Sequence, residues 1–321
     1  MSKKRLLSGI KPTGAMHIGN YLGAMKQFVD LQQEYESFVF VADLHSLTSV
    51  QDGKRLPQLT LDIVMDYLAV GLDPESVVLY KQSDIPAHTE LCWIFNCITT
   101  MPYLMRAHAF KDAEAKNKDI NVGTFDYPMI MAADILLYST DVVPVGKDQK
   151  QHVEFARDTA EKFNLTFGET FKLPEARIPE EVAVIPGIDG QKMSKSYGNT
   201  IPLFGSDEEI RKACMSVVTD SRGKGEPLDP ETDNVFALHR FFTSDIDDLK
   251  QRYLDGGIGY KESKELLAEN IITMIAPMRE KRQELEQNQG YVKEILNQGA
   301  EKAKVVAEEK MEEVRERIGT K

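Results

Sequence analysis

Short apolar runs alternate with longer amphipathic stretches over the first half of the chain. Each run is rich in Val, Leu, Phe or Tyr and is short enough for a buried strand. The predicted strands are Leu6-Leu7, 37–42, 77–80 and 142–145. Between or after them, helical spacing of apolar residues predicts helices near 22–31, 56–70, 89–100, 128–138 and 149–163. Strands that alternate with helices predict an α/β fold, a Rossmann-like doubly wound parallel sheet.

The second half changes to helical periodicity only. Predicted helices cover 207–218, 234–242, 246–254, 260–286 and 292–318. We therefore expect a Rossmann-like catalytic domain over 1–204, with a polar insertion near 104–127, and an all-helical domain over 205–321. The helix 292–318 has one apolar face, which predicts that it packs back on the body of the protein.

Composition narrows the function classes. The net charge of -12 argues against binding nucleic acid over a broad surface, so any RNA contact must be local. We expect no membrane segment, because no apolar run approaches the roughly 18 residues that a span requires. The three cysteines, Cys92, Cys97 and Cys214, have no paired metal-ligand spacing, which favours reduced thiols, no metal site and a cytoplasmic location.

A first candidate site lies just after the first strand. Residues 8–14 form a turn rich in glycine and proline, and His17-Ile18-Gly19-Asn20 opens an amphipathic helix. Unpaired N–H groups at a helix start attract anions, and His17 and Asn20 add donors for phosphate or ribose oxygens. Gly19 would let a nucleotide approach the backbone. Alone, the tetrapeptide is equally compatible with an ordinary turn and a solvated histidine.

A second candidate site is Lys192-Met193-Ser194-Lys195-Ser196. A chance match to five specified residues in such a chain has a likelihood on the order of one in ten thousand. Lys192 and Lys195 can follow negative charge onto a leaving pyrophosphate, and the serines add hydroxyl donors. Glycines at 187, 190 and 198 suggest a loop with freedom to close. The alternative is an ordinary solvated lysine loop.

Together the two motifs resemble the HIGH and KMSKS signatures of class I aminoacyl-tRNA synthetases. The surrounding sequence resembles the bacterial tryptophanyl-tRNA synthetase family over nearly the whole chain. Further blocks carry this resemblance: 8–14, 43–45, 131–138 and 143–152. It implies a tryptophan--tRNA ligase, an enzyme that uses ATP to form tryptophanyl-adenylate and pyrophosphate and then charges tRNA(Trp).

The resemblance also implies a nucleotide site, a metal and partners. Mg²⁺ would accompany ATP, no iron-sulfur cluster is expected, and the protein would be a homodimer that binds ATP, L-tryptophan and tRNA(Trp). Catalytic roles fall on His17, Asn20, Lys192 and Lys195. The implied ATP-binding residues are Lys11, Pro12, Thr13, Gly19, Asn20, Gly146, Lys147, Asp148, Ile185, Lys192, Met193, Ser194, Lys195 and Ser196.

Asp134 is the most informative single carboxylate. On a helix its neighbours three and four residues away are apolar, so the charge needs a partner. That partner is either the ring N–H of an aromatic substrate or a nearby lysine or arginine. By resemblance, Asp134 accepts from the tryptophan indole, with Met131 and Val145 against the ring. His45, Tyr127 and Gln149 are candidates for the amino and carboxylate ends, or are satisfied core residues.

Three alternatives remain open at this stage. A tyrosyl-tRNA synthetase would share the architecture, and amino-acid-dependent pyrophosphate exchange separates it. A small-molecule nucleotidyltransferase would not need the helices after Leu203. A non-catalytic paralogue that binds tryptophan or RNA would show decay of the phosphate motifs, which are intact here.

Overall fold

The structure, a computed structural model, describes residues 3–115, 120–146, 149–178, 185–223 and 225–321. Contacts divide the chain into two compact units, which are described separately. Unit 1 comprises Met1–Gly14, Gln27–Glu180 and Asn288–Lys321, and unit 2 comprises Ala15–Lys26 and Glu181–Gln287. These units are defined by contacts alone, and the functional division into 1–204 and 205–321 stays a prediction.

Unit 1 is built on a five-stranded sheet in which every pairing is parallel. The strands are β1 (Arg5–Ile10), β2 (Glu36–Val41), β3 (Val77–Lys81), β4 (Val142–Pro144) and β5 (Glu175–Arg177). Their order, β3-β2-β1-β4-β5, places β1 at the centre, as doubly wound sheets do. The predicted Rossmann-like fold is confirmed. Strand β5 was not predicted, because its three residues have no apolar run.

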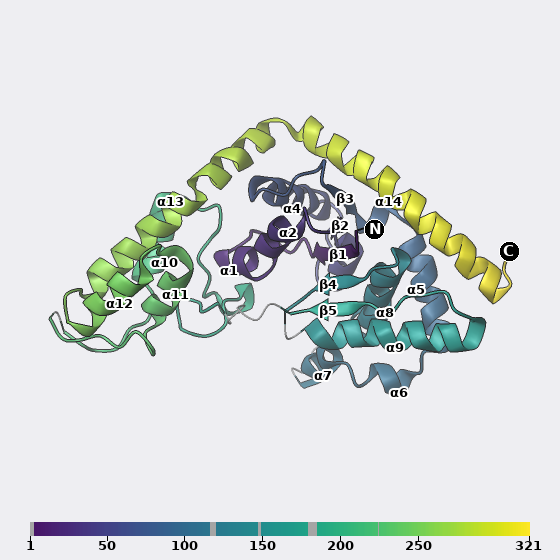
Figure 1. Ribbon diagram of the computed structural model, residues 1–321, viewed down its shortest axis with the longest axis horizontal. Coiled ribbons are helices and arrows are strands. Elements are labelled where there is room, and N and C mark those ends of the chain that lie inside the picture. Colours follow the sequence, from purple (N-terminus) through teal and green to yellow (C-terminus); the bar gives the residue numbers. More distant parts are fainter. Residues whose placement is uncertain (1–2, 116–119, 147–148, 179–184, 224) are drawn as a thin grey trace. The chain divides into compact units, whose positions relative to one another are not determined.

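Helices of unit 1 lie around this sheet, some packed on its strands and others on neighbouring helices (Figure 1). They include α2 (Lys26–Leu31, whose first residue belongs to unit 2), α3 (Asp43–Ser46), α4 (Leu56–Ala69), α5 (Ala87–Ile98), α6 (Met101–Leu104), α7 (His108–Ala115), α8 (Val122–Leu137), α9 (Lys150–Phe167) and α14 (Gln289–Ile318). Alternate strand residues such as Leu7, Phe38 and Tyr80 form one buried cluster with α5, α8, α9 and α14.

Helix α8 begins earlier than the sequence predicted. The expected start at 128 followed Pro128, but the helix starts at Val122 because Asn121 caps it, with Oδ1 accepting from the Thr124 N–H at 2.8 Å. Helix α7 likewise lies in the stretch 104–127 that was expected to be an insertion without apolar periodicity. Cysteines at 92 and 97 are both expected to fill core space; Cys92 is buried, whereas Cys97 is exposed.

Helix α14 packs directly on the edge strand β3. Its closest approach is at Gly299, where an added Cβ would lie 1.8 Å from the carbonyl oxygen of Leu79. Only glycine allows the helix backbone to come this near to the strand. The contact covers the outer edge of the sheet, which would otherwise present unpaired backbone groups.

Unit 2 is mainly helical. It contains α1 (Ile18–Asn20), the π-helical turn η1 (Tyr21–Met25), α10 (Asp207–Met215), α11 (Asn234–Phe242), α12 (Ile246–Leu254) and α13 (Tyr260–Gln287). Helices α10 and α11 pack on α13. A buried cluster that includes Phe236, Leu249 and Tyr253 closes the interior. The 3-10 turn η4 (Lys195–Tyr197) carries the second sequence motif.

Candidate functional site

A buried carboxylate is the centre of the candidate site in unit 1. Asp134 lies on α8, is 1% exposed, and accepts hydrogen bonds from three side chains. Its Oδ2 lies 2.7 Å from His45 Nε2, and its Oδ1 lies 2.7 Å from Gln82 Nε2 and 2.6 Å from His88 Nδ1. The protein partners of Asp134 are therefore two histidines and an amide, not the lysine or arginine that the sequence analysis weighed.

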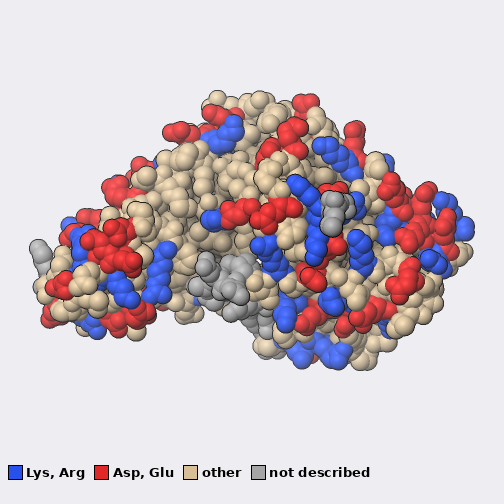
Figure 2. All heavy atoms as spheres, viewed as in Figure 1, with Lys and Arg blue, Asp and Glu red and all other residues tan. Residues whose placement is uncertain are grey.

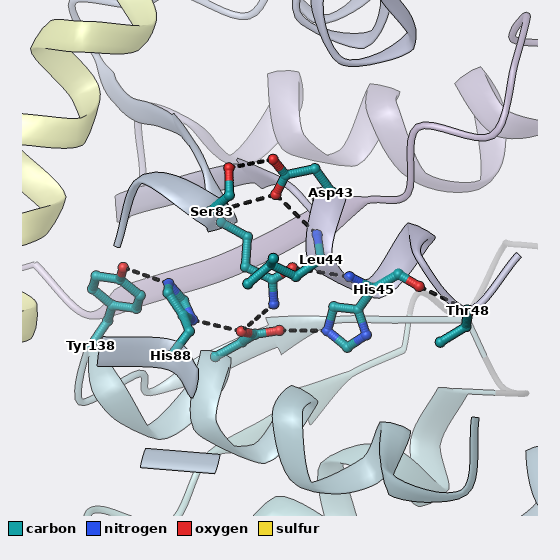
Figure 3. Close-up of polar contacts among 9 residues, drawn as sticks. Asp43, Leu44, His45, Thr48, Ser83, His88 and Tyr138 are labelled. Atoms are coloured by element: carbon teal, nitrogen blue, oxygen red, sulfur yellow. Dashed lines mark hydrogen bonds and ion pairs between the residues drawn. The ribbon is translucent and has the colours of Figure 1, made fainter. Parts of the chain in front are cut away.

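Strand ends bring these partners together. His45 lies on α3 directly after β2, and Gln82 opens the turn η2 (Gln82–Asp84) directly after β3. Because β2 and β3 are parallel neighbours, both segments emerge at the same edge of the sheet. Asp43 joins them, since its Oδ1 accepts from the Ser83 N–H at 3.0 Å (Figure 3).

The electrostatic balance keeps Asp134 ionised. Burial alone would raise the pKa of this carboxyl, but His45 and His88 beside it hold that pKa below its ordinary value. An ionised carboxylate only accepts, so His45 must donate from Nε2 and His88 from Nδ1. The other ring nitrogen of His88, Nε2, is hydrogen-bonded to the Tyr138 hydroxyl at 3.0 Å (Figure 3).

His45 has a second ring nitrogen that is not used by Asp134. Its Nε2 donates to Asp134, whereas the buried Nδ1 has no hydrogen-bond partner among the described residues. His45 is 4% exposed, so an unpaired polar atom there is costly. Nδ1 is therefore a candidate contact for the polar end of a ligand.

Tyr127 and Lys11 lie beside His45. The rings of Tyr127 and His45 have centroids 4.5 Å apart, and Lys11 Nζ lies 5.3 Å from the Tyr127 centroid. Burial, with the negative charge of Asp134, raises the pKa of Tyr127 to about 12, so its hydroxyl stays protonated. Burial lowers the pKa of Lys11. Tyr127 and His45, predicted to share a pocket with Asp134, are brought together.

The other predicted site residues of unit 1 differ in how deeply they are buried. Met131 and Val145 are half-buried and pack against the main core cluster, and Gln149 precedes α9. Gly146 is half-buried, Pro12 buried and Thr13 exposed. The predictions for Lys147 and Asp148 fall outside the described residues.

In unit 2, His17 and Asn20 cap the start of the helix reciprocally. The Asn20 N–H donates to His17 Nδ1 at 3.3 Å, and the His17 N–H donates to Asn20 Oδ1 at 3.2 Å. Because Nδ1 accepts, the ring proton lies on Nε2. Packing within the protein already favours glycine at position 19, without any nucleotide. A Cβ there would lie 2.9 Å from His17 Nδ1 and 3.3 Å from Met193 Cβ.

The lysine loop is organised by Asn199, a buried residue that the sequence analysis missed. Its Oδ1 accepts from the Ser194 N–H at 2.8 Å, and its Nδ2 donates to Asp189 Oδ1 at 2.8 Å and to the Lys192 carbonyl at 3.1 Å. Met193 and Ile185 are buried beneath the loop and joined by a backbone hydrogen bond of 2.9 Å. Lys192, Lys195 and Ser196 are exposed, and Ser194 is half-exposed.

Two of the loop glycines have a different role from the one predicted. A Cβ on Gly187 would lie 2.4 Å from Asn199 Cγ, and one on Gly190 would lie 2.7 Å from Asn234 Oδ1. Gly190 also has φ of +81°. These positions allow close packing and a tight turn, which fixes this part of the loop instead of freeing it.

The two sequence motifs meet within unit 2. The Ile18 N–H donates to the Ile201 carbonyl and the Leu203 N–H donates to the Met16 carbonyl, both at 3.0 Å. Burial, together with the charge of Lys195, lowers the pKa of His17 to about 4. His17 is therefore a neutral Nε2–H donor at physiological pH, and the lysines supply the positive charge.

Three polar residues of the site could not be singled out from the sequence. Gln82 and His88 lie in a stretch whose strand and helix patterns give them no special place, and Asn199 resembles an ordinary loop residue. Their importance comes from partners 52, 46 and 5 residues away. A buried acid at 134 does, however, require donors, and His88 was one of only six histidines.

The described residues give two findings on metals and membranes. They contain no group of three or more His, Cys, Asp or Glu side chains that could hold a metal ion. No described helix is both long and apolar enough to cross a bilayer. Acidic and basic side chains are intermingled on the face shown in Figure 2.

A parallel sheet of this strand order, with a capped histidine turn and a lysine loop, has the features of a nucleotide-using α/β enzyme. Residues 2–276 match the sequence model of the tRNA synthetases class I (W and Y). The chain is 50% identical over 320 residues to the tryptophan--tRNA ligase of Fusobacterium nucleatum, with 98% of each chain covered. It belongs to the class I tRNA synthetases of this W and Y family.

Solved structures of tryptophanyl-tRNA synthetases are similar to this chain, in agreement with its assignment to the W and Y family. A tryptophanyl-tRNA synthetase from Campylobacter jejuni, complexed with ADP and tryptophan, superposes with a TM-score of 0.91 at 47% identity and covers 98% of this chain and 99% of its own. The enzyme from Mycoplasma pneumoniae gives a TM-score of 0.86 at 30% identity, covering 99% and 98%.

Proposed function

We propose that this protein is a tryptophan--tRNA ligase. The observation that carries the proposal is the ionised, buried carboxylate of Asp134 beside His45 and Tyr127, in a chain whose full-length relatives have this activity. A buried carboxylate with an aromatic ring close to it suits a flat apolar ligand that has one N–H donor. Tryptophan is the amino acid with that chemistry.

The reaction needs no protein nucleophile. A tryptophan carboxylate oxygen attacks the α-phosphorus of ATP, the bond to the bridging oxygen breaks, and pyrophosphate leaves. A hydroxyl of the terminal tRNA ribose then attacks the adenylate carbonyl, and AMP leaves. The protein contributes positioning and charge stabilisation.

The phosphate-handling roles fall on unit 2. His17 Nε2–H and the Asn20 side-chain amide are neutral donors at a capped helix start, and Lys192 and Lys195 are mobile cations on a loop anchored by Asn199. We assign the four residues to the phosphates of ATP. Mg²⁺ is expected to arrive with the nucleotide, held by phosphate oxygens, and to neutralise part of their charge.

The tryptophan-binding roles fall on unit 1. Asp134 accepts from the indole N–H, and Met131 and Val145 contact the ring. His45, through its unpartnered Nδ1, is assigned with Gln149 and Tyr127 to the polar end of the substrate. Phenylalanine would leave the Asp134 acceptor unfilled, and such a loss supports discrimination of about 10⁴ or more.

The test is exchange of labelled pyrophosphate into ATP across all twenty amino acids. We expect exchange with tryptophan alone, followed by charging of tRNA(Trp). Exchange that depends on tyrosine would establish the tyrosyl alternative. Absence of exchange with every amino acid would indicate a non-catalytic paralogue.

Partners and location complete the proposal. We assign tRNA(Trp) as the RNA partner and the cytoplasm as the location, on the basis of the family. A homodimer is supported by exposed apolar side chains on the neighbouring helices α5, α6 and α8, where Trp93 is 70%, Met101 61% and Val122 80% exposed. Light scattering should give the dimer mass, and Trp93→Glu should shift the protein toward monomer.

A further inference from the structure

We propose that Gln82 and His88 are positioning residues that reserve one oxygen of Asp134, Oδ2, for the substrate's ring N–H. This inference rests on the proposed function and deepens it. It assigns tryptophan selectivity to two residues that make no direct contact with the ligand. Their effect is exerted by filling the other carboxylate oxygen.

The argument starts from the hydrogen-bonding capacity of the carboxylate. Each carboxylate oxygen has two lone pairs and accepts two good hydrogen bonds. Oδ1 receives two, from Gln82 Nε2 at 2.7 Å and His88 Nδ1 at 2.6 Å. Oδ2 receives one, from His45 Nε2 at 2.7 Å, among the described residues. The remaining capacity of Asp134 is on Oδ2.

Both donors are themselves held in place. The Gln82 amide is oriented by its Oε1, which accepts from the His45 backbone N–H at 3.3 Å. His88 is held by its second nitrogen, which lies 3.0 Å from the Tyr138 hydroxyl (Figure 3). Neither donor can turn away from Oδ1 without losing another hydrogen bond. Gln82 and His88 are both 0% exposed, so no solvent is at hand to replace that bond.

With both donors in place, the carboxylate of Asp134 is held in one plane, and its Oδ2 is the oxygen that can accept a further hydrogen bond. If either donor is lost, Oδ1 is left with an unfilled lone pair in a buried site, and the carboxylate gains freedom to rotate toward whichever donor remains. The ligand's N–H then meets a less well-placed acceptor. Binding of a ligand without that N–H does not depend on this arrangement.

The test uses tryptophan and its benzothienyl analogue, in which sulfur replaces the ring N–H. The variants are Gln82→Met, His88→Gln and His88→Asn. Gln82→Met has no donor, and His88→Gln places its amide nitrogen near the position of Nε2 and leaves no donor at that of Nδ1. His88→Asn restores a donor, because its amide nitrogen lies near the position of Nδ1. Gln32→Met is the matched control, because Gln32 is a buried amide in unit 1 that hydrogen-bonds Gly71 and Asp73 away from Asp134. KM for each amino acid and for ATP is measured by pyrophosphate exchange, with thermal unfolding alongside.

We expect Gln82→Met and His88→Gln each to raise KM for tryptophan about tenfold to a hundredfold, the range for a buried acceptor left unpaired. KM for the analogue and for ATP should change less than about threefold. His88→Asn should restore most of the preference for tryptophan, and Gln32→Met should leave it intact whatever it does to stability.

Equal weakening of tryptophan and analogue in both donor variants would overturn the inference, since a merely structural role affects both ligands alike. Unchanged preference in both folded donor variants would overturn it too. Failure of the proposed function is a separate outcome, because it would appear in the wild-type protein as absence of tryptophan-dependent exchange.

Discussion

His17 and Asn20 hydrogen-bond each other in both directions, with the side chain of each accepting from the backbone N–H of the other. This reciprocal cap separates two roles of the histidine. Nδ1 accepts from the helix start, which leaves Nε2–H for the phosphate contact that we propose. The cap also holds the ring in one orientation before ATP arrives.

His17→Asn should therefore reduce catalysis with little loss of stability. Asparagine is a good N-cap but does not reach the position of Nε2. We expect tryptophan-dependent exchange to fall about a hundredfold, as for loss of one transition-state donor. His17→Ala should lose the same activity and also about 1 kcal/mol of unfolding free energy. Equal exchange rates in His17→Asn and wild type would remove the imidazole from the mechanism.

Lys195→Ala should slow adenylate formation far more than it weakens tryptophan binding. A mobile ammonium group that follows charge onto pyrophosphate acts mainly in the transition state. We expect the exchange rate to fall by about 10² to 10³ while the dissociation constant of tryptophan changes less than about threefold. Lys261→Ala, an exposed lysine on α13 of the same unit, is the control. An unchanged exchange rate would refute the assigned role.

Asn199→Ala should release the lysine loop without touching a substrate. The substitution removes three hydrogen bonds that fix Ser194, Asp189 and the Lys192 carbonyl. We expect at least about a tenfold lower exchange rate and a loss of about 2 to 3 kcal/mol in unfolding free energy. Limited proteolysis should cut the variant near residues 189–199 faster than wild type. If Asn199→Ala were cleaved and exchanged pyrophosphate at the wild-type rates, the loop would be held by other contacts.

Stability should decline in acid through His239. Burial outweighs the hydrogen bond to Ser263 and lowers the pKa of this histidine to about 4, against an ordinary 6.5. Between those values the unfolded chain binds the proton and the folded one does not, so unfolding free energy rises with pH. The loss on acidification from pH 6.5 to 4 is up to about 3 kcal/mol, and His17 adds a loss of the same sign.

The measurement is chemical denaturation of wild type and His239→Asn at several pH values. The variant is expected to be less stable at pH 7 and to show a shallower decline toward pH 4. Parallel curves for the two proteins would mean that the acid sensitivity arises elsewhere.

Gly299→Ala should destabilise unit 1 by several kcal/mol. The new methyl group would meet the Leu79 carbonyl oxygen at 1.8 Å, and backbone on both sides leaves no flexible atom to move. Gly290→Ala in the same helix is the matched control, since its nearest neighbour is the Asn288 side chain at 3.9 Å. That control should be neutral or stabilising by up to about 1 kcal/mol. Similar melting curves for both variants would show that α14 shifts without cost.

The sequence was sufficient for the parallel sheet because β2 and β3 are dense apolar runs that alternate with helical patterns. It was also sufficient for the two motifs, whose residue types are rare in combination. It did not predict β5, where Glu175 and Arg177 flank a single alanine. It could not place Gln82, His88 or Asn199, because their roles arise from contacts between segments that periodicity does not relate.

The same limit applies to the glycines. A close approach between two segments depends on both of them and cannot be read from one. Gly187 and Gly190 therefore suggested flexibility, whereas the structure shows that they are points of tight packing. For Asp134, the apolar spacing indicated burial correctly. The identity of its partners depended on where β2 and β3 end.

The packing of α14 on β3 also affects the order in which the protein can fold during synthesis. These two elements are separated by most of the chain, so the ribosome releases β3 long before the helix that covers it. Through that interval the nascent sheet carries an open edge able to pair with other chains. Translation speed and chaperone access in this window should therefore affect how much of the protein reaches the native state.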